Sequence, residues 1–357
     1  MINITVLTLV DRIACFYSLY PFFTNTDKRF SFTYTSDPDW CLSKDGNRIL
    51  IMMRQFIKPD YVDLDMMTSL RAKYERIAFF HDDAGGGIPR LSLLPYVDVF
   101  YTKALFRDRS LYGRQLYGKE LYSDYYHRKY GVVDSDCRDR SVVRDAGEIG
   151  KLRLSWNIGV GNYPRSHFRQ RTGVALSRVT RPDASRFFYV RDRFDPDRAI
   201  ADNGGLYQVH ARFGQISRPS ISYQRKLILD VLGNRSDFLT GMVSQKRFNR
   251  ETAHSKLVIS PFGWGEICLR DFETIRSAAL LLKPDMSHLE TWPDIFIPGA
   301  TYVPFSWDAD DLIEKARYYL TNSDKRLAIV RRAAVKYRDD LNELQNRFSS
   351  IMEEIAI

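Results

Sequence analysis

The sequence predicts an α/β protein made of two Rossmann-like halves that face each other across a cleft. Its 357 residues exceed one ordinary core and suit two domains. Short apolar runs alternate with segments of helical length in the first hundred residues, and the same alternation resumes after about residue 205. Such alternation implies largely parallel sheets, and its interruption marks where one half gives way to the other.

The first half is expected to contain strands buried on both faces, with helices between them. Apolar or alternating runs predict strands over residues 2–9, 30–36, 47–56, 76–87 and 96–105, the fourth of which ends in a glycine loop. Helical length predicts helices over residues 12–23 and 61–76. In the second of these, acidic residues come early and basic residues late, as the helix dipole favours.

Between about residues 105 and 175 the alternation breaks down into loop-rich sequence crowded with tyrosine and arginine. We therefore expect an N-terminal Rossmann-like domain over residues 1–165 and a C-terminal one over 166–325. Residues 326–357 are charged and helical throughout, and their apolar stripe predicts a segment that packs back on the body of the protein.

The second half repeats the strand and helix pattern. Strands are expected over residues 205–214, 255–260 and 294–305, and helices over residues 222–233, 268–282 and 308–322. Gly233 stops the first of these helices.

Composition limits the classes of partner and compartment. A formal net charge of +9 favours phosphate-bearing partners: nucleic acid, an anionic membrane face or a nucleotide-linked substrate. The four cysteines are far apart and form no metal or disulfide pattern, which favours reduced thiols in the cytoplasm. The apolar N-terminal stretch lacks a basic start, and Asp11 and Arg12 interrupt it, so a buried strand and helix are expected there instead of a signal or membrane span.

Residues 255–285 carry the clearest chemical pattern. An apolar strand ends in a loop with Gly263 and Gly265, where backbone can approach a ligand closely, and the helix that follows offers its N-terminal amides to an anion. Arg270 can reach a diphosphate as a forked donor, and Glu273, at i+3 on the same face, can accept from ribose hydroxyls. The alternative is a surface ion pair between the two, worth about 0.5 kcal/mol or less.

These residues also resemble a known signature. The matching positions are Ser255, Lys256, Pro261, Gly263, Gly265, Arg270, Glu273 and Leu280–Leu282. They resemble the nucleotide-sugar signature of GT-B glycosyltransferases, most closely the exostosin-like and CgeB-like group, in which an apolar strand follows the helix. Residues 301–322 are similar to the next segment of those enzymes, and residues 209–228 are similar to an earlier one that contributes Arg212, Gly214 and Arg225.

The resemblance covers about residues 205–335 and implies a GT-B fold and a hexosyl- or related transferase. Its donor would be a nucleotide-diphosphate sugar, and its acceptor a glycan or lipid-linked glycan in surface polysaccharide synthesis, with no cofactor and no metal. The donor-binding residues that it implies are Arg212, Lys256, Gly263, Gly265, Glu266, Arg270, Glu273 and His288. Glu266 and Glu273 are one residue closer together than the glutamate pair of retaining members, so both stereochemical outcomes stay open.

Catalytic candidates come from the first half. His81, Asp82 and Asp83 follow the strand that begins at residue 76, where a base could deprotonate an acceptor hydroxyl. The alternative is that one of the aspartates caps a helix or turns the loop. Arg212, Lys256 and Arg270 are the candidates for stabilising the leaving diphosphate. The acidic motifs at residues 134–136 and 308–310 fall in a loop and a helix start, and we expect no metal there.

Two other functional classes compete with the transferase. A basic nucleic-acid-binding protein would use the arginines and tyrosines of residues 105–145 as a groove, and an assembly protein would keep the fold without the chemistry. We favour a cytoplasmic transferase with no nucleic-acid partner, which could contact the anionic inner face of a membrane that carries its acceptor.

Overall fold

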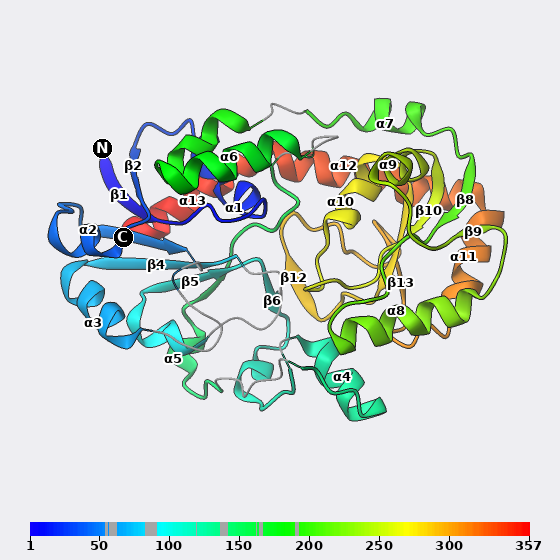
Figure 1. Cartoon of the computed structure of the whole chain (residues 1–357), viewed down its shortest axis with the longest axis horizontal. Helices are drawn as coiled ribbons and strands as arrows, with labels where there is room; N and C mark the ends of the chain where they lie inside the picture. The colour runs from blue at the N-terminus through cyan, green and yellow to red at the C-terminus, as the bar shows by residue number, and fades with distance from the viewer. Residues whose placement is uncertain are drawn as a thin grey trace.

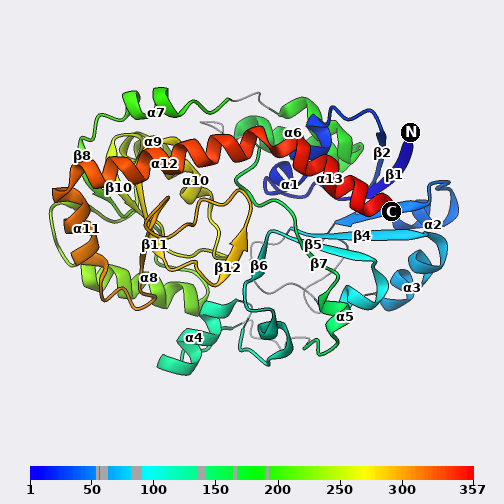
Figure 2. The ribbon, with the colours of Figure 1, turned by 180° about the vertical axis from the view of Figure 1, so that it is seen from behind.

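The computed structural model describes residues 1–53, 56, 63–82, 91–118, 120–135, 142–161, 163, 167–189 and 193–357. Two α/β halves lie side by side in it, and a long C-terminal helix runs from the second half back to the first (Figure 1). The N- and C-termini lie at the same end of the molecule in both views (Figures 1 and 2).

All strands of the first sheet are parallel, and its order is β2-β1-β3-β4-β5-β7. The strands are β1 (Ile2–Leu7), β2 (Phe30–Thr35), β3 (Ile49–Met53), β4 (Arg76–His81), β5 (Val99–Thr102) and β7 (Leu152–Leu154). The described helices of this half are α1 (Cys15–Thr24), α2 (Pro38–Ser43), α3 (Leu64–Lys73), α4 (Leu121–Tyr130), α5 (Ala146–Ile149) and α6 (Phe168–Val179). Short 3-10 turns are η2 (Leu91–Tyr96), η3 (Arg109–Gly113) and η4 (Pro182–Phe188).

The second sheet is also parallel, with the order β13-β11-β10-β8-β9. Its strands are β8 (Tyr207–His210), β9 (Phe238–Leu239), β10 (Ser255–Ile259), β11 (Leu280–Pro284) and β13 (Val303–Phe305). The helices are α7 (Pro196–Asp202), α8 (Pro219–Leu232), α9 (Gln245–Ala253), α10 (Leu269–Arg276), α11 (Leu312–Thr321), α12 (Ser323–Asn342) and α13 (Leu344–Ala356).

The two sheets share one connection order. In each, the first strand of the half has the second strand on one side and the third on the other, so the order reverses between β1 and β3, and between β8 and β10. The expectation of two Rossmann-like halves followed by C-terminal helices is therefore confirmed. Ligands of such sheets bind beyond the carboxyl ends of the strands where the order reverses.

Strand burial follows from composition. Every residue of β3 is buried, because Leu50 and Met52 face one hydrophobic cluster and Ile49, Ile51 and Met53 face another. A sheet covered on both faces needs such continuous apolar strands.

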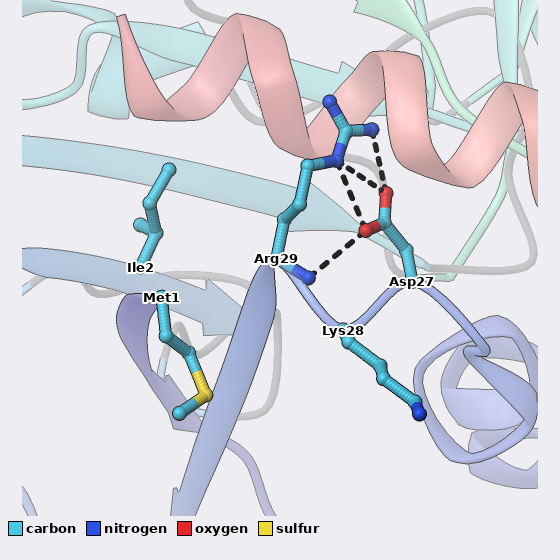
Figure 3. A pocket seen from close by; sticks show the side chains of 5 residues that line it. All are labelled: Met1, Ile2, Asp27, Lys28 and Arg29. Carbon is cyan, nitrogen blue, oxygen red and sulfur yellow. Dashed lines mark hydrogen bonds and ion pairs between the residues drawn. The ribbon is translucent and has the colours of Figure 1, made fainter.

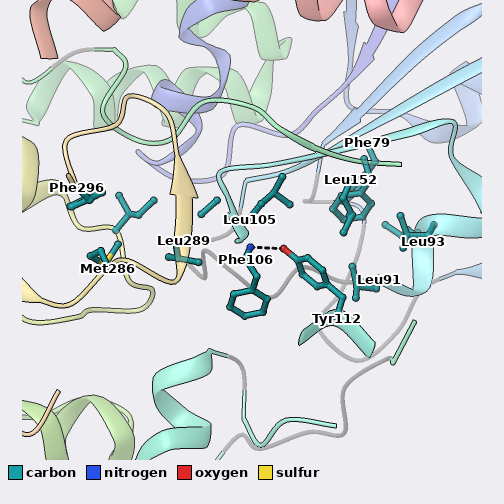
Figure 4. Packing of buried hydrophobic residues seen from close by; sticks show 14 of the residues in the cluster. Phe79, Leu91, Leu93, Leu105, Phe106, Tyr112, Leu152, Met286, Leu289 and Phe296 are labelled. Carbon is teal, nitrogen blue, oxygen red and sulfur yellow. Dashed lines mark hydrogen bonds between the residues drawn. The ribbon is translucent and has the colours of Figure 1, made fainter. Parts of the chain in front are cut away.

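The halves meet around a small antiparallel sheet. β6 (Ala104–Phe106) follows directly on β5, and it pairs with β12 (Leu289–Thr291), which follows β11. The carboxyl ends of β5 and β11 are therefore brought together in the middle of the molecule. Apolar side chains from both halves pack there, including Leu105 and Phe106 with Met286, Leu289 and Phe296 (Figure 4).

Packing assigns α6 and η4 to the first half, although the sequence analysis begins the second domain at residue 166. Val174, Phe188 and Tyr189 join the apolar cluster of α1 and β1, and the ring centroid of Tyr189 lies 4.8 Å from that of Phe16. We therefore propose a boundary between Tyr189 and Tyr207.

The C-terminal helices divide between the halves. Ile329 and Val330 of α12 pack in the apolar cluster of the second half, while Phe348 and Ile351 of α13 pack in that of the first. The return of the C-terminal segment to the body follows the expectation from its apolar stripe.

Two expected elements differ from the structure. The helix expected over residues 268–282 ends at Arg276, because Ser277 and Ala278 turn the chain, and Leu280–Pro284 form β11, as the resemblance implies. The strand expected over residues 294–305 is reduced to Val303–Phe305. Apolar content alone does not distinguish a buried strand from the end of a helix.

Candidate functional site

The loop between β10 and α10 forms the floor of the candidate site. Gly263 leaves little room for a side chain, since a Cβ there would lie 3.1 Å from the Cys268 sulfur, which would have to move by a few tenths of an ångström. The Gly263 amide donates to the Gly265 carbonyl at 3.0 Å, which closes the loop on itself. Trp264, between these glycines, is 63% exposed, so its ring does not serve to pack the loop.

A fully buried ion pair fixes the base of this loop. Asp271 in the first turn of α10 accepts hydrogen bonds from the Ser260 hydroxyl at 2.6 Å, the Cys268 amide at 2.8 Å and the Lys283 ammonium at 3.0 Å. Lys283 also lies over the ring of Phe262. Three successive segments, β10, α10 and β11, are thereby held together at one carboxylate.

Contacts from the first half hold the same loop from the other side. The Tyr122 hydroxyl of α4 donates to the Gly263 carbonyl at 2.9 Å and accepts from Arg218 at 2.7 Å. Arg218 is itself buried against Glu120 and Asp134. The loop is therefore preorganised by both halves of the chain.

Two arginines converge on this loop without a carboxylate partner in the described part of the chain. Arg270 of α10 donates to the Arg212 carbonyl at 3.1 Å, and its Nε is buried without a hydrogen-bond acceptor. Arg225 of α8 donates to the carbonyls of Gly214 at 2.7 Å and Phe262 at 3.4 Å, and its Nε is also buried without an acceptor. The carbonyls that they contact belong to the loops after β8 and β10.

The electrostatics of this pair are unfavourable in the absence of an anion. Burial lowers the pKa of Arg225, and the positive charge of Arg270 lowers it further. Two like charges that are partly removed from water repel each other more strongly than they would in bulk solvent. An anion between them would relieve both costs.

Glu273 lies one helical turn beyond Arg270. The two side chains form no ion pair within 4.0 Å, and the Glu273 carboxylate makes no hydrogen bond to the described residues. Burial raises its pKa, which the charges of Arg270 and His167 partly offset. The spacing of Arg270 and Glu273 also allowed a surface ion pair between them, and the structure does not contain this pair. Both oxygens of the Glu273 carboxylate can therefore accept hydrogen bonds from a ligand.

Glu273 also lies near the first half. Its charge raises the pKa of Tyr17 in α1 and of Tyr163, although burial is the larger cause for both. The arginine and glutamate of α10 thus lie where the second half meets the first.

Arg212 and Lys256 have other partners, which corrects their expected contact with the diphosphate. Arg212 donates to both oxygens of Glu251, at 2.6 and 3.0 Å, and to the Thr240 carbonyl, and Glu251 also accepts from Arg247 at 2.7 Å, so the Arg212 guanidinium is already engaged by a carboxylate. Lys256 lies at the amino end of β10 and donates to Gln208, whereas the glycine loop follows the carboxyl end.

Glu266 and His288 are buried behind the loop. Glu266 has no exposed surface. Burial and the charge of Glu120 are the larger causes of the raised pKa of Tyr122, and the charge of Glu266 raises it further. His288 lies between Phe106 and Trp307, and burial lowers its pKa to about 4, so the ring is neutral near pH 7. Both lie in the wall of the site instead of its opening.

Two of the catalytic candidates, His81 and Asp82, lie at the carboxyl end of β4. His81 packs 6.0 Å from the ring of Phe100, and the Asp82 carbonyl accepts a hydrogen bond from Lys103. Burial is the main cause that raises the pKa of Cys15 to about 12, and the charge of Asp82 contributes to this increase. Asp83 lies outside the described residues.

The acidic motifs considered for metal serve as ties between the halves. Asp134 accepts from Ser220 and forms an ion pair with Arg218, and Asp308 accepts from Tyr125, Lys129 and Tyr130. A surface hollow of about 680 Å³ at the other end of the first half is lined by Met1, Ile2, Asp27, Lys28 and Arg29 (Figure 3). It lies at the amino ends of β1 and β2, and Arg29 there is neutralised by Asp27 and Glu353.

Sequence reasoning missed Asp271, Lys283 and Tyr122, and it gave Arg225 no role in the donor site. The sequence contains one indication of the role of Lys283, because it is a single cation that directly follows three leucines in an apolar run. Tyr122 left none, because the partner of its hydroxyl is 141 residues away.

Comparisons with known proteins bear on the second half and on the fold. Residues 222–353 match the family described as glycosyl transferase-like, from α8 to α13. No curated protein matches the chain. Solved structures that resemble it include HepE of Anabaena in complex with UDP-glucose, at 9% identity and a TM-score of 0.47 over 99% of this chain and 100% of that one.

Two further structures are similar in the same way. One is a DNA-modifying β-glucosyltransferase, at 12% identity and a TM-score of 0.47 over the whole of both chains. The other is a glycosyltransferase from Rickettsia africae, at 10% identity and a TM-score of 0.46 over 99% of this chain and 98% of that one. Because these TM-scores are below 0.5, the fold assignment rests on the strand order of the chain itself, which is that of two Rossmann-like halves with a returning C-terminal helix, the GT-B arrangement.

Proposed function

We propose that the protein is a glycosyltransferase that takes a sugar from a nucleotide-diphosphate donor, without a metal ion or other cofactor. The observation that carries this proposal is the convergence of Arg225 and Arg270 where the strand order of the second sheet reverses, with no carboxylate partner for either among the described residues. The match of residues 222–353 to the glycosyl transferase-like family supports the same assignment.

Arg225 and Arg270 would bind the diphosphate. Their guanidinium groups come from α8 and α10, and the loops that they contact follow β8 and β10, the two strands on either side of the reversal. A forked guanidinium donates two parallel hydrogen bonds to a phosphate. Fixed positive charge there also stabilises the diphosphate as it leaves, which is the main electrostatic demand of the reaction.

Glu273 would accept hydrogen bonds from the ribose hydroxyls. It lies at i+3 from Arg270 on the same helix, and its carboxylate has no other hydrogen bond to the described residues. Trp264, exposed beside the glycines, offers a flat surface on which the nucleobase could stack.

The catalytic base is assigned to His81, Asp82 or Asp83 at the end of β4. The carboxyl ends of the two sheets are brought together by the pairing of β6 with β12, so a base on the first sheet can serve a donor on the second. The acceptor is proposed to be a glycan or a lipid-linked glycan in surface polysaccharide synthesis, with the enzyme in the cytoplasm. The structure has no described helix with the length and apolarity to span a bilayer.

The nucleic-acid alternative is not favoured. A groove for nucleic acid would need the tyrosines of residues 105–145 on the surface. Tyr112, Tyr122 and Tyr126 are instead buried, with 2% of the first and none of the other two exposed. These rings belong to the core that joins the halves.

The test is a thermal-shift panel of UDP, GDP and CMP on the whole chain, followed by transfer assays with the matching nucleotide sugar. A ligand at 100 times its Kd stabilises the folded state by about 2.7 kcal/mol, so a true donor nucleotide raises Tm measurably. Arg270→Ala and Glu273→Ala should abolish transfer without unfolding the protein. Lys226→Ala, on the exposed face of α8, is the control that should leave transfer unchanged.

Two outcomes would contradict the proposal. An unchanged Tm with every nucleotide would favour an assembly protein that kept the fold and lost the chemistry. Normal transfer by both variants would show that the donor is held elsewhere.

A further inference from the structure

The outer face of α6 is apolar. Phe168 is 74% exposed and Val179 is 80% exposed, with Leu176 half-exposed between them. Residues at the buried side of the same helix are mostly small or polar: Gln170, Gly173 and Ser177. The usual distribution in a surface helix is therefore inverted.

Helix geometry places these exposed residues in one stripe. Each residue advances about 100° around an α-helix, so positions i, i+4, i+8 and i+11 share a face. Phe168, Thr172, Leu176 and Val179 have this spacing, with Ala175 beside them. Arg171 and Arg178 lie on one flank of the stripe, and Arg169 lies on the other.

The turn η4 extends this surface. α6 and η4 pack against each other, and Phe187 in η4 is 67% exposed, with the Arg186 guanidinium 4.8 Å above its ring. Between residues 167 and 189 the one acidic residue is Asp183, which pairs with Arg181 at 3.3 Å. Arg178 also donates to the Asp11 carbonyl at 2.6 Å, and the arginines outside the Arg181–Asp183 pair give this face a net positive charge.

The orientation of α6 is fixed by packing of its inner face. A Cβ on Gly173 would lie 2.7 Å from the ring of Phe16, so α1 approaches the helix as closely as a glycine permits. Gln170 is buried and hydrogen-bonded to His167 at 2.6 Å. Figure 1 shows α6 along the outer edge of the first half, over α1. The apolar stripe therefore cannot rotate inward.

We infer that the outer face of α6 and η4, defined by Phe168, Leu176, Val179 and Phe187 with Arg169, Arg171, Arg178, Arg181 and Arg186, binds the surface of an anionic lipid bilayer. An apolar stripe flanked by arginines is suited to the interface, where the rings and aliphatic groups enter the acyl boundary and the guanidinium groups contact anionic headgroups. This inference concerns binding alone and holds independently of the transferase assignment.

Other occupants fit the surface less well. Nucleic acid would use the arginines, but phosphates and base edges gain little from exposed Leu176 and Val179. A second copy related by two-fold symmetry would bring arginines against arginines at the same patch. A lipid surface satisfies the apolar and the cationic parts together.

The experiment is sedimentation of the full chain with vesicles, at 0.15 M salt. Vesicles of phosphatidylcholine are compared with vesicles that contain one-third phosphatidylglycerol, and we expect binding only to the latter. Phe168→Ser with Val179→Ser and Phe187→Ser should abolish this binding. Arg169→Gln with Arg171→Gln should lower the partition coefficient about fivefold for each arginine removed.

The control is Ile216→Ser with Met242→Ser, which removes two apolar residues exposed elsewhere on the chain and should leave binding unchanged. All substitutions are at exposed positions, and an unchanged Tm shows that folding is retained. Equal binding by the triple serine variant, or no binding to anionic vesicles, would overturn the inference. So would binding to duplex DNA that depends on the arginines alone, or a dimer abolished by the serine substitutions.

Discussion

The ammonium group of Lys283 lies 3.0 Å from the carboxylate of Asp271, and neither side chain exposes any surface. Two charges removed from water in this way are costly unless each is satisfied by the other and by further hydrogen bonds. Asp271 has two such bonds, from Ser260 and the Cys268 amide, so the pair serves to fix the glycine loop in one position.

Removal of one member of this pair should destabilise the fold strongly. Lys283→Met is expected to lower the free energy of unfolding by about 3–5 kcal/mol, because it leaves the Asp271 charge buried without its partner. Adding Asp271→Asn should recover part of the loss. Urea unfolding measures both, and Lys226→Met, which breaks an exposed pair with Asp230, should cost less than about 1 kcal/mol. Equal losses for the two lysines would contradict the argument.

The two arginines next to each other at the candidate site should respond differently to substitution. Arg212→Gln should cost about 1–3 kcal/mol of stability, because the buried Glu251 loses its bidentate partner and keeps only its ion pair with Arg247. Arg270→Gln should cost less than about 1 kcal/mol, because Arg270 has no carboxylate partner. The nucleotide-induced rise in Tm should show the reverse order, with the larger loss in Arg270→Gln. A large loss of stability in Arg270→Gln would assign that arginine to the fold instead of the ligand.

The contrast between these arginines shows where sequence reasoning ends. The spacing of Arg270 and Glu273 behind a glycine loop predicted two side chains on one helix face, because that relation is local. The ion pair between Arg212 and Glu251 could not be predicted, since Glu251 lies on a helix 39 residues further along the chain. Lys256 lies away from the glycine loop for a simpler reason: a residue at the start of a strand lies at the opposite edge of the sheet from the loop that follows the strand.

The fold, like the site, could be predicted where it depends on local sequence and could not where it depends on contacts between distant residues. Strands with continuous apolar runs, such as β1, β3 and β10, were predicted close to their observed bounds, because strands that are buried on both faces consist mainly of apolar residues. The domain boundary was placed at residue 166 because the strand and helix pattern breaks down before it, whereas the packing of α6 favours a later boundary. Only the contacts of Gly173 and Val174 with α1 and its neighbours decide which face is inside.

Glu273 should make the stability of the ligand-free protein depend on pH. Burial raises its pKa above the ordinary value of 4.5, so the folded state binds a proton more readily than the unfolded state. Its contribution to stability is therefore fully present below pH 4.5 and is lost as the pH rises through the folded pKa. Glu273→Gln should raise Tm relative to the parent at pH 7.5 but not at pH 4, while it weakens the response to nucleotide. A lower Tm of the variant at pH 7.5 would show that the carboxylate has a structural partner.

The buried histidines should produce the opposite dependence. Burial lowers the pKa of His210 and His288 from 6.5 to about 4, so the unfolded state binds more protons between these values. Stability is then complete above pH 6.5 and declines as the pH falls toward 4, by at most about 3 kcal/mol for each ring. His288→Phe fits between Phe106 and Trp307 and should flatten the decline measured by urea unfolding at pH 8 and pH 5. An unchanged slope would contradict the neutral state of His288.

Tyr122 should couple the first half to the nucleotide site. Its hydroxyl donates to the Gly263 carbonyl at 2.9 Å and accepts from Arg218 at 2.7 Å, so Tyr122→Phe frees the loop from α4 without changing the packing of the ring. The expected loss of stability is about 1–3 kcal/mol, the cost of leaving buried polar groups without a partner.

The matched control is Tyr74→Phe, which removes another buried hydroxyl, bonded to Asp45 at 2.6 Å within the first half. Both variants should lose stability to a similar extent in urea, because each leaves a buried polar partner unsatisfied. Only Tyr122→Phe should reduce the rise in Tm caused by the nucleotide, since only its hydroxyl positions the glycine loop. If the two variants respond equally to nucleotide, the bond between α4 and Gly263 has no part in organising the site.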